Sequence, residues 1–204
     1  MFEVLETHCL LMSRSKKYNK EQVLAAATEL FWQRGYDGTS MNDLVEHSGL
    51  NRHSMYNEFG DKERLFLSCI DYYVIEDSKE VISILRREPI GLKNIEEFID
   101  NRVQYAVSDD CQGCLLINTV TEKEIVSDKI NNKVSVILRS QEELIHLCLK
   151  AAQEKGEISK KNDCKTLTVY LSCFFRGLMN MGKGAHNRAS LKQLAEIAML
   201  AIKR

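Results

Sequence analysis

Two cysteine thiols three residues apart form the most reactive pattern in the sequence. Cys111 and Cys114 flank a Gln-Gly pair, and the apolar segment that follows them predicts a short helix. Thiols at this spacing beside a helix start can have a lowered pKa and can form a disulfide. Two aspartates directly upstream disfavour the thiolate. The pair is therefore a candidate redox or electrophile sensor, and a purely structural pair of thiols is the alternative.

Metal binding and enzyme catalysis have weaker support in the sequence. His146 and Cys148 are the closest residues that could complete a zinc site with these thiols, but only through folding, because their spacing is not that of a zinc motif. The five histidines follow no catalytic spacing, and the sequence has neither a phosphate-binding glycine loop nor a nucleophile elbow. We therefore expect no metal, no cofactor and no enzymatic activity.

A second group of polar side chains, in residues 51–57, suits hydrogen bonding rather than catalysis. In a helix here, Leu50, Met55 and Phe59 would point inward. The outward positions would then carry polar groups, which are Arg52, His53, Ser54, Tyr56 and Asn57. A helix this short is unstable alone. Packed against other helices, however, its outward row of donors suits a groove of DNA.

The neighbouring segments would position this row. Residues 41–48 are amphipathic at helical spacing, Thr39 or Ser40 can cap their start, and Ser48-Gly49 can end them. After the polar row, Asp61 can cap a longer helix, which places the following lysine where a phosphate docks at a helix start. Two short helices around a glycine turn, followed by a longer helix, are the layout of a helix-turn-helix DNA reader.

About 45 residues in one register carry a resemblance to a known family. The matching residues are Val23 to Ala27, Leu30-Phe31, Gly35, Thr39-Ser40, Ser48-Gly49-Leu50, Met55-Tyr56, Phe59 and Lys62 to Leu65. This stretch resembles the DNA-binding domain of TetR/AcrR-type transcriptional regulators. Many relatives have glycine or proline in place of His53, and histidine or tyrosine in place of Glu58. We expect both departures to affect which bases are read.

We assign DNA contacts on this basis. Base-edge contacts are expected from Arg52, His53 and Asn57. Phosphate contacts that position the helix are expected from Thr39, Ser40, Ser54, Tyr56 and Lys62. An acid-free basic stretch precedes the first helix and contains Arg14, Lys16, Lys17 and Lys20. This stretch either reaches flanking phosphates or is a solvated arm.

The remaining sequence predicts an all-α protein with no strand alternation. Helices are expected over 19–34, 61–85, 114–120 and 127–155, from Asn94 through Val107, from 162 or 163 to the Gly182–Gly184 turn, and from Ser190 onward. We expect Glu97 to act as the capping-box partner of Asn94. The expected domains are an N-terminal arm (1–18), a three-helix helix-turn-helix DNA-binding domain (19–66) and a helical ligand-binding and dimerisation domain (67–204). Met12, followed by basic residues, resembles a natural start, with residues 1–11 as a short extension in the alternative.

The last two predicted helices carry more apolar surface than one inward stripe needs. Ala195, Ala198 and Ala201 would permit close approach of another helix. The resemblance implies that these helices form a homodimer interface, and ordinary core packing is the alternative. Residues suited to line an effector pocket are Phe98, Tyr105, Cys114, Asn118, Tyr170, Phe174 and Met179. For each of them, plain core packing is the competing interpretation. Residues 113–119, followed by Glu122, also resemble a stretch found in some members of the family.

Composition limits the class of protein. The 204 residues include 44% apolar and 28% charged residues, one proline and seven cysteines, and the net charge of −1 argues against a general polyanion binder. An odd cysteine count and the lack of a membrane-length apolar run predict a reduced, cytoplasmic protein with no membrane partner. The expected function is that of a homodimeric repressor released from a palindromic double-stranded DNA operator by a small-molecule effector. The alternatives are a regulator that senses oxidants through Cys111 and Cys114, and a helical interaction module that does not bind DNA.

Overall fold

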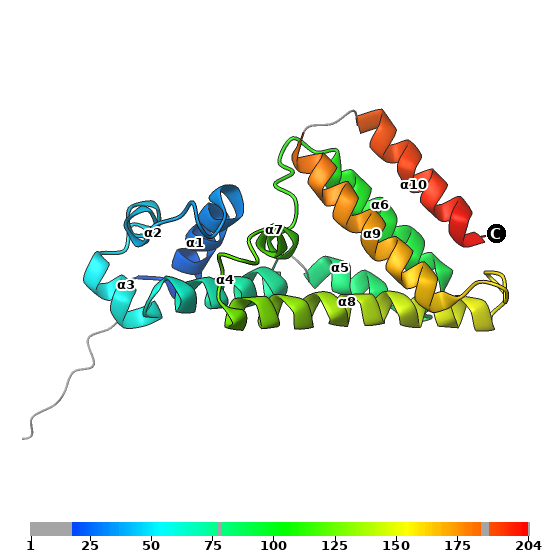
Figure 1. Cartoon of the computed structure of the whole chain (residues 1–204), viewed down its shortest axis with the longest axis horizontal. Coiled ribbons are helices and arrows are strands. Elements are labelled where there is room, and N and C mark those ends of the chain that lie inside the picture. Colours follow the sequence, from blue (N-terminus) through cyan, green and yellow to red (C-terminus); the bar gives the residue numbers. More distant parts are fainter. Residues whose placement is uncertain (1–17, 77–78, 185–187, 204) are drawn as a thin grey trace, which may run out of the picture.

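The computed structural model describes residues 18–76, 79–184 and 188–203, and within these ranges the secondary structure is helical with no strand. The molecule is elongated (Figure 1). Helices α1 to α3 lie at one end and α6, α9 and α10 at the other, while α4, α5 and α8 run along one side. The candidate start at Met12 and the basic residues Arg14, Lys16 and Lys17 lie outside the described residues.

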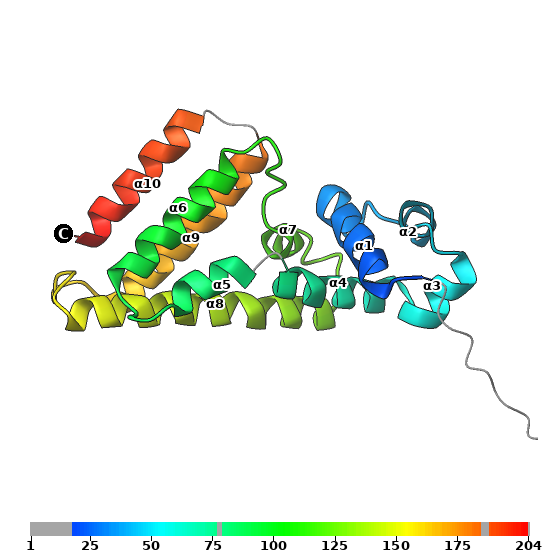
Figure 2. The ribbon, with the colours of Figure 1, turned by 180° about the vertical axis from the view of Figure 1, so that it is seen from behind.

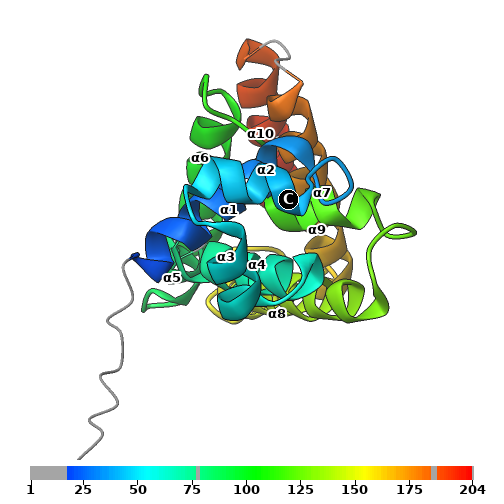
Figure 3. The same cartoon turned by 90° about the vertical axis from the view of Figure 1, so that its left-hand side faces the viewer.

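The first four helices form the head of the molecule, and they follow the predicted order. They are α1 (Lys20–Arg34), α2 (Met41–Ser48), α3 (Arg52–Phe59) and α4 (Lys62–Glu76). Asn19 caps α1, because its side chain accepts hydrogen bonds from the backbone amides of Glu21 and Gln22. Viewed from this end, α2 and α3 lie in front of the rest of the chain (Figure 3).

The head shares its apolar core with parts of the chain far away in sequence. Phe31, Leu44, Met55 and Phe66 are buried together at its centre. The same cluster includes buried residues of α7 (Leu115–Thr121) and of the first half of α8 (Asp128–Glu154). Packing therefore does not follow the domain boundary predicted at residue 66, because α4, α7 and α8 complete the core of the head.

Residues 61–85, predicted as one helix, contain two described helical segments. They are α4 and α5 (Lys79–Arg86), and residues 77–78 between them lie outside the described residues. The buried residues of α4 belong to the core of the head, whereas Val81, Ile84 and Leu85 of α5 belong to a second cluster with α6 and α8. The two segments therefore bury their apolar faces in different cores. Seen from behind, α5 lies along α8 (Figure 2).

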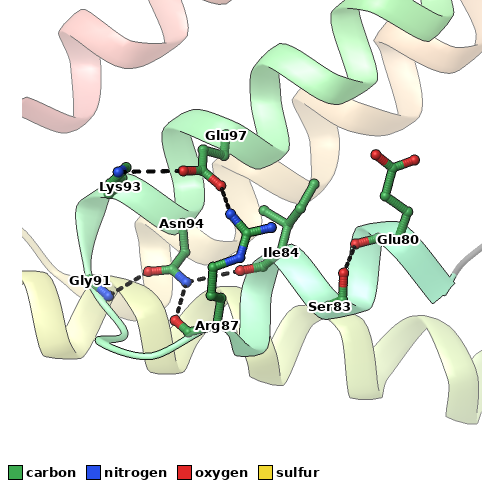
Figure 4. Close-up of polar contacts among 8 residues, drawn as sticks. All are labelled: Glu80, Ser83, Ile84, Arg87, Gly91, Lys93, Asn94 and Glu97. Atoms are coloured by element: carbon green, nitrogen blue, oxygen red, sulfur yellow. Dashed lines mark hydrogen bonds and ion pairs between the residues drawn. The ribbon is translucent and has the colours of Figure 1, made fainter.

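The start of α6 (Leu92–Ala106) also differs from the prediction, because Asn94 is inside the first turn. Its buried side chain accepts a hydrogen bond from the Gly91 amide and donates to the carbonyls of Ile84 and Arg87 (Figure 4). Asn94 thus joins α5 to α6. Glu97 is not its capping partner but pairs with Arg87 at 2.6 Å.

The body of the molecule is built on α6, α9 (Cys164–Lys183) and α10 (Arg188–Lys203), with α5 and the second half of α8. Asp163 caps α9 through the amides of Lys165 and Thr166. In α10, Ala195 and Ala198 are buried against the rest of this chain. These two alanines are therefore not available for close approach of a second copy, contrary to the prediction.

Helix α8 connects the head and the body. It lies within the predicted range 127–155, Ser127 caps its start, and it continues for 27 residues. Ile130, Val134 and Leu138 are buried in the head, and Ile145 and Leu149 are buried in the body. Across the described residues, no helix combines the length and apolar character needed to cross a membrane.

Candidate nucleic-acid interface and regulatory core

The turn between α2 and α3 has the geometry expected of a helix-turn-helix. Gly49 has φ +68° and ψ 4°, the left-handed conformation that favours glycine. A Cβ at this position would meet nothing within 4 Å, so conformation rather than space favours glycine here. Leu50 follows the turn and is buried, as are Met55 and Phe59 on the inner face of α3. The predicted inward face of α3 is confirmed.

The outer face of α3 presents its polar side chains in two pairs. His53 Nε2 lies 2.9 Å from Asn57 Nδ2. The Arg52 guanidinium lies 5.8 Å from the centroid of the Tyr56 ring. All four residues are exposed, and Ser54 between them is half-buried. Because residues four apart share a helix face, each pair would present hydrogen-bonding groups to the same side of a groove.

The two candidate phosphate contacts ahead of α2 differ in access. Ser40 is exposed and caps α2 in a reciprocal box, in which its amide donates to the Asp43 carboxylate at 2.8 Å. Hydrogen bonds from Ser40, aided by Arg34, lower the pKa of Asp43. Thr39, in contrast, is fully buried and its hydroxyl donates to the Gly35 carbonyl at 2.7 Å. We therefore withdraw the phosphate contact proposed for the Thr39 side chain and regard it as a structural residue.

Lys62 is the first residue of α4, directly after its cap. Asp61 Oδ1 accepts a hydrogen bond from the Arg64 amide at 2.9 Å, which confirms the predicted cap. Lys62 Nζ lies 4.2 Å from the centroid of the Tyr36 ring. Burial lowers the pKa of Lys62, while the charges of Asp37 and Glu122 act in the opposite direction. The ammonium group is thus held at the helix start by the aromatic face.

Glu58 contacts its own chain instead of facing outward. Its carboxylate accepts a hydrogen bond from the Tyr18 hydroxyl at 2.7 Å and pairs with Lys20 Nζ at 3.0 Å. The expectation that Glu58 affects base reading is therefore corrected, because this side chain fastens the segment before α1 to α3. Lys20, one of the four basic residues assigned to the arm, is engaged in the same contact.

Known proteins match both halves of this arrangement. Residues 23–69 match the family described as bacterial regulatory proteins, tetR family, and residues 91–198 match the tetracyclin repressor-like C-terminal domain. The chain belongs to the TetR family. It is a DNA-binding transcriptional regulator, and the predicted all-α fold with an N-terminal helix-turn-helix domain is confirmed.

Relatives of this TetR-family chain align with it over most of their length. The HTH-type transcriptional repressor ComR of Escherichia coli is 31% identical over 196 residues, which cover 94% of this chain and 92% of ComR. The uncharacterised regulator YezE of Bacillus subtilis is 29% identical over 167 residues, covering 79% of this chain and 84% of YezE. The same fold is found in a structure of the TetR-family regulator CifR, a cysteine mutant complexed with 26-bp operator DNA. The TM-score is 0.82 at 22% identity, and the match covers 92% of this chain and 99% of the CifR chain.

The seven candidate effector residues of this TetR-family protein lie in three different environments. Phe98 and Met179 are buried in the core of the body, where the rings of Phe98 and Phe175 are 4.2 Å apart. Phe174 packs on the same Phe175 ring at 5.5 Å. Tyr170 lies on the exposed outer face of α9. We therefore reassign Phe98, Phe174 and Met179 to core packing and remove Tyr170 from the pocket.

The other three candidates surround the loop that enters α7. The Tyr105 hydroxyl accepts a hydrogen bond from the Gln112 amide at 3.1 Å, and Asn118 Nδ2 donates to the Gln112 carbonyl at 3.3 Å. Cys114 Sγ accepts a hydrogen bond from the Tyr73 hydroxyl at 3.4 Å. Burial raises the pKa of Tyr73, and burial raises that of Tyr105 to about 12, so both phenols stay protonated at neutral pH.

Several residues at this junction between head and body were missed from the sequence. Trp32 of α1 packs against the rings of Tyr73 and Tyr105, at 5.0 and 6.4 Å. Within the described part of the chain, Trp32 Nε1 and Gln112 Oε1 are buried and have no hydrogen-bond partner. The sequence did contain one sign of this junction. A large apolar Trp32 directly after the inward-facing Phe31 indicates a second buried face on the first helix.

A groove of about 690 Å³ opens beside this junction, between the end of α1, α7 and α9. Of the seven candidate effector residues, Asn118 lines it. Its lining also carries the charged side chains of Arg34, Glu122, Arg176 and Lys183.

The thiols and the imidazole considered for metal binding have other partners. Cys111 and Cys114 are free thiols, half-buried on the loop before α7. His146 Nδ1 lies 3.2 Å from the Thr168 hydroxyl, and Cys148 Sγ donates to the Leu85 carbonyl. Burial raises the pKa of Cys148 to about 11, which disfavours a thiolate ligand. The described residues contain no group of three or more histidine, cysteine or acidic side chains placed to hold a metal.

Proposed function

We propose that this TetR-family regulator is a homodimeric repressor that binds a palindromic operator and leaves it when a small-molecule effector binds. The observation that carries the proposal is that α3 and the pair α9 and α10 lie at opposite ends of the chain (Figure 1) and that each has an exposed face. A polar face on α3 is suited to base edges, and an apolar face on α9 and α10 is suited to a second copy. The name of ComR as a repressor supports the direction of control. Such a protein acts on the chromosome, in the cytoplasm.

The dimer face that we propose consists of exposed apolar residues on two neighbouring helices. They are Val169, Tyr170, Leu194, Ile197 and Leu200. Large apolar side chains gathered on an exposed face are typical of interaction sites. A twofold pair of chains would also place two copies of α3 for two half-sites, which a palindrome provides.

The effector site that we propose is the junction around Tyr105. Trp32 Nε1 is a buried donor and Gln112 Oε1 a buried acceptor without partners in the described chain. Both residues border Tyr105, since the ring of Trp32 lies 6.4 Å from its ring and the backbone amide of Gln112 donates to its hydroxyl. An effector with one acceptor and one donor group would satisfy both atoms. It releases DNA only if it binds the conformation with low operator affinity more tightly.

A redox-sensing regulator is the second candidate function, because the Cys114 thiol contacts Tyr73 of α4, a helix that is part of the head. A hydroperoxide would oxidise Cys111 and Cys114 to a disulfide, with water and an alcohol as the products. Mobility-shift titration with peroxide tests this function on the wild type and on Cys111→Ser and Cys114→Ser. Equal release from all three proteins would remove it.

Selection of genomic DNA fragments by the purified protein, under reducing conditions and at physiological salt, tests the main proposal. We expect enrichment of one palindromic site, bound by two copies of the chain. If the folded protein enriches no sequence, the proposal fails, and a helical interaction module without DNA binding becomes the better description.

A further inference from the structure

The carboxylate of Glu122, at the end of α7, binds the turn between the first two helices of the head. Glu122 follows α7 directly. Its Oε2 atom accepts a hydrogen bond from the Tyr36 amide at 2.9 Å, and its Oε1 atom accepts one from the Asp37 amide at 3.0 Å. Hydrogen bonds from amides to an ionised carboxylate are stronger than those between neutral groups. One side chain thus joins two parts of the chain that are about 85 residues apart in sequence.

The backbone of the turn provides the space for this carboxylate. Gly35 has φ +78° and ψ 173°, a conformation that is largely restricted to glycine. A Cβ on Gly35 would lie 2.8 Å from Glu122 Oε1, which is closer than such atoms pack. Glycine at this position therefore serves two purposes, since it permits the backbone conformation and leaves room for the carboxylate.

The turn that Glu122 holds is connected to the residues expected to meet DNA. The Tyr36 ring packs against Phe66 of α4 at 5.0 Å and lies beneath Lys62 Nζ at 4.2 Å. Three residues after Asp37, Ser40 caps α2. A shift of this turn relative to the body would therefore move the start of α2 and the environment of Lys62 together.

At its other end, α7 contacts both cores of the molecule. It lies between the head and the body in both side views (Figures 1 and 2). Leu115 and Leu116 are buried in the head, whereas Ile117 packs against the core of the body. Asn118 binds the loop that arrives from α6. A change in the body that shifts this loop is transmitted to Glu122 through one short helix.

We propose that Glu122 is a positioning residue that sets the angle of the DNA-reading head against the body and couples movements of α7 to operator affinity. This inference rests on the proposed function, because it requires an operator. The Glu122 contact differs from a purely stabilising contact because the spacing of the two DNA-reading heads in the dimer depends on it. Loss of the carboxylate therefore changes which operator spacings are accepted, in addition to the stability of the fold.

The test compares E122Q with E124Q as the matched control. Glu124 is exposed, lies two residues further along, and loses the same charge in its variant. Operator binding is measured for the selected site and for versions with one base pair added or removed between the half-sites. We expect E122Q to bind the selected site about tenfold more weakly, within the usual range of coupling between sites. We also expect its preference over the altered spacings to fall, while E124Q matches the wild type.

Two outcomes separate this inference from the proposed function. A wild-type protein without any operator would contradict the proposed function itself. A wild type that binds its operator, with E122Q showing the same affinity and the same spacing preference, would overturn the role of Glu122 alone. A lower melting temperature with unchanged spacing preference would overturn it too, because that result describes a stabilising contact only. If E122Q does not fold, Glu122→Asp replaces it, since the shorter side chain cannot reach both amides.

A second measurement uses the close approach of Gly35 to the same carboxylate. Gly35→Ala introduces the Cβ that would collide with Glu122, and this collision is absent when Glu122 is alanine. We expect the effects of the two changes on operator affinity to be less than additive, as for residues in contact. Hydrogen exchange at the Tyr36 and Asp37 amides should be faster in E122Q than in E124Q. Additive effects together with unchanged exchange would contradict the contact described.

Discussion

The outer face of α3 and the outer faces of α9 and α10 are both exposed, but their chemistry is opposite. The α3 face carries a histidine and an asparagine joined by a polar contact, and an arginine beside a tyrosine ring. The faces of α9 and α10 carry valine, isoleucine and leucine side chains, with Val169 63% and Ile197 58% exposed. A polar row loses little by remaining in water, whereas an apolar face is stabilised by being covered. The same chain therefore presents one face suited to a polyanion and one suited to a copy of itself.

This difference separates two requirements of a TetR-family regulator. Reading a base sequence depends on a few polar groups placed by a rigid head. Reading a palindrome depends on a second head at a fixed distance, which the body supplies. Substitutions at the apolar face should therefore strongly weaken binding to every DNA sequence, whereas substitutions at α3 should change the preference at particular base pairs.

Placing a charge at the centre of the apolar face is expected to have the largest effect. Ile197→Asp should yield a monomer, and its operator affinity should fall about a hundredfold or more because two linked heads become independent. Sedimentation and mobility shift measure the two effects. Val136→Asp is the matched control, since Val136 is 62% exposed on α8 and lies outside this face. If Ile197→Asp remains a dimer, the interface lies elsewhere.

Removing one base-reading side chain should have a smaller and more local effect. Arg52→Ala should cost about 1–3 kcal/mol of binding free energy at one base pair and relax the preference there. Selection from a library of operator variants measures this change, and the other positions of the site act as internal controls. An unchanged preference at every position would mean that Arg52 does not read a base.

Removing a phosphate contact should weaken binding to every sequence equally. Lys62→Ala should make the dependence of log affinity on log salt shallower by about one unit, because one fewer counterion is released. Lys129→Ala, which alters an exposed lysine of α8, is the control and should leave the slope unchanged. A steeper or unchanged slope in Lys62→Ala would exclude a phosphate contact.

The smallest effect on operator affinity is expected at Thr39, which we reassigned from a phosphate contact to a structural residue. Thr39→Val removes the hydrogen bond to the Gly35 carbonyl while keeping the side-chain shape, so the free energy of unfolding should fall by about 1 kcal/mol. Operator affinity of the folded variant should stay near that of the wild type. Chemical denaturation and mobility shift measure the two quantities, and the reverse pattern would restore Thr39 as a phosphate contact.

The parts of the fold set by local chemistry could be predicted from the sequence. Asn19, Ser127 and Asp163 begin helices because their side chains accept amide hydrogen bonds, and this depends on only a few neighbouring residues. Gly49 likewise marks its turn through its own backbone freedom. The inward face of α3 followed from helical spacing alone. For these features, the information lies within one or two turns of the chain.

Features that depend on distant contacts could not be predicted in this way. Thr39 and Ser40 are adjacent and chemically alike, yet one is buried and the other exposed because of how α1 and α2 pack. The periodic pattern through residues 61–85 did not reveal that its two parts face different cores. Apolar candidates such as Phe98 could not be assigned to a pocket or to the core, since both require the same side chains. Glu122 gave no local sign that its partners are amides in another domain.

The burial of α8 in two cores restricts insertions and deletions in this helix. Its first half is buried in the head and its second half in the body, with Leu138 the last fully buried head residue and Ile145 the first fully buried body residue. Inserting one residue between them would turn one half by about 100° and lengthen the helix by about 1.5 Å. The apolar stripe of one half would then face solvent. The number of residues in this segment is therefore fixed by the need to keep both stripes in phase.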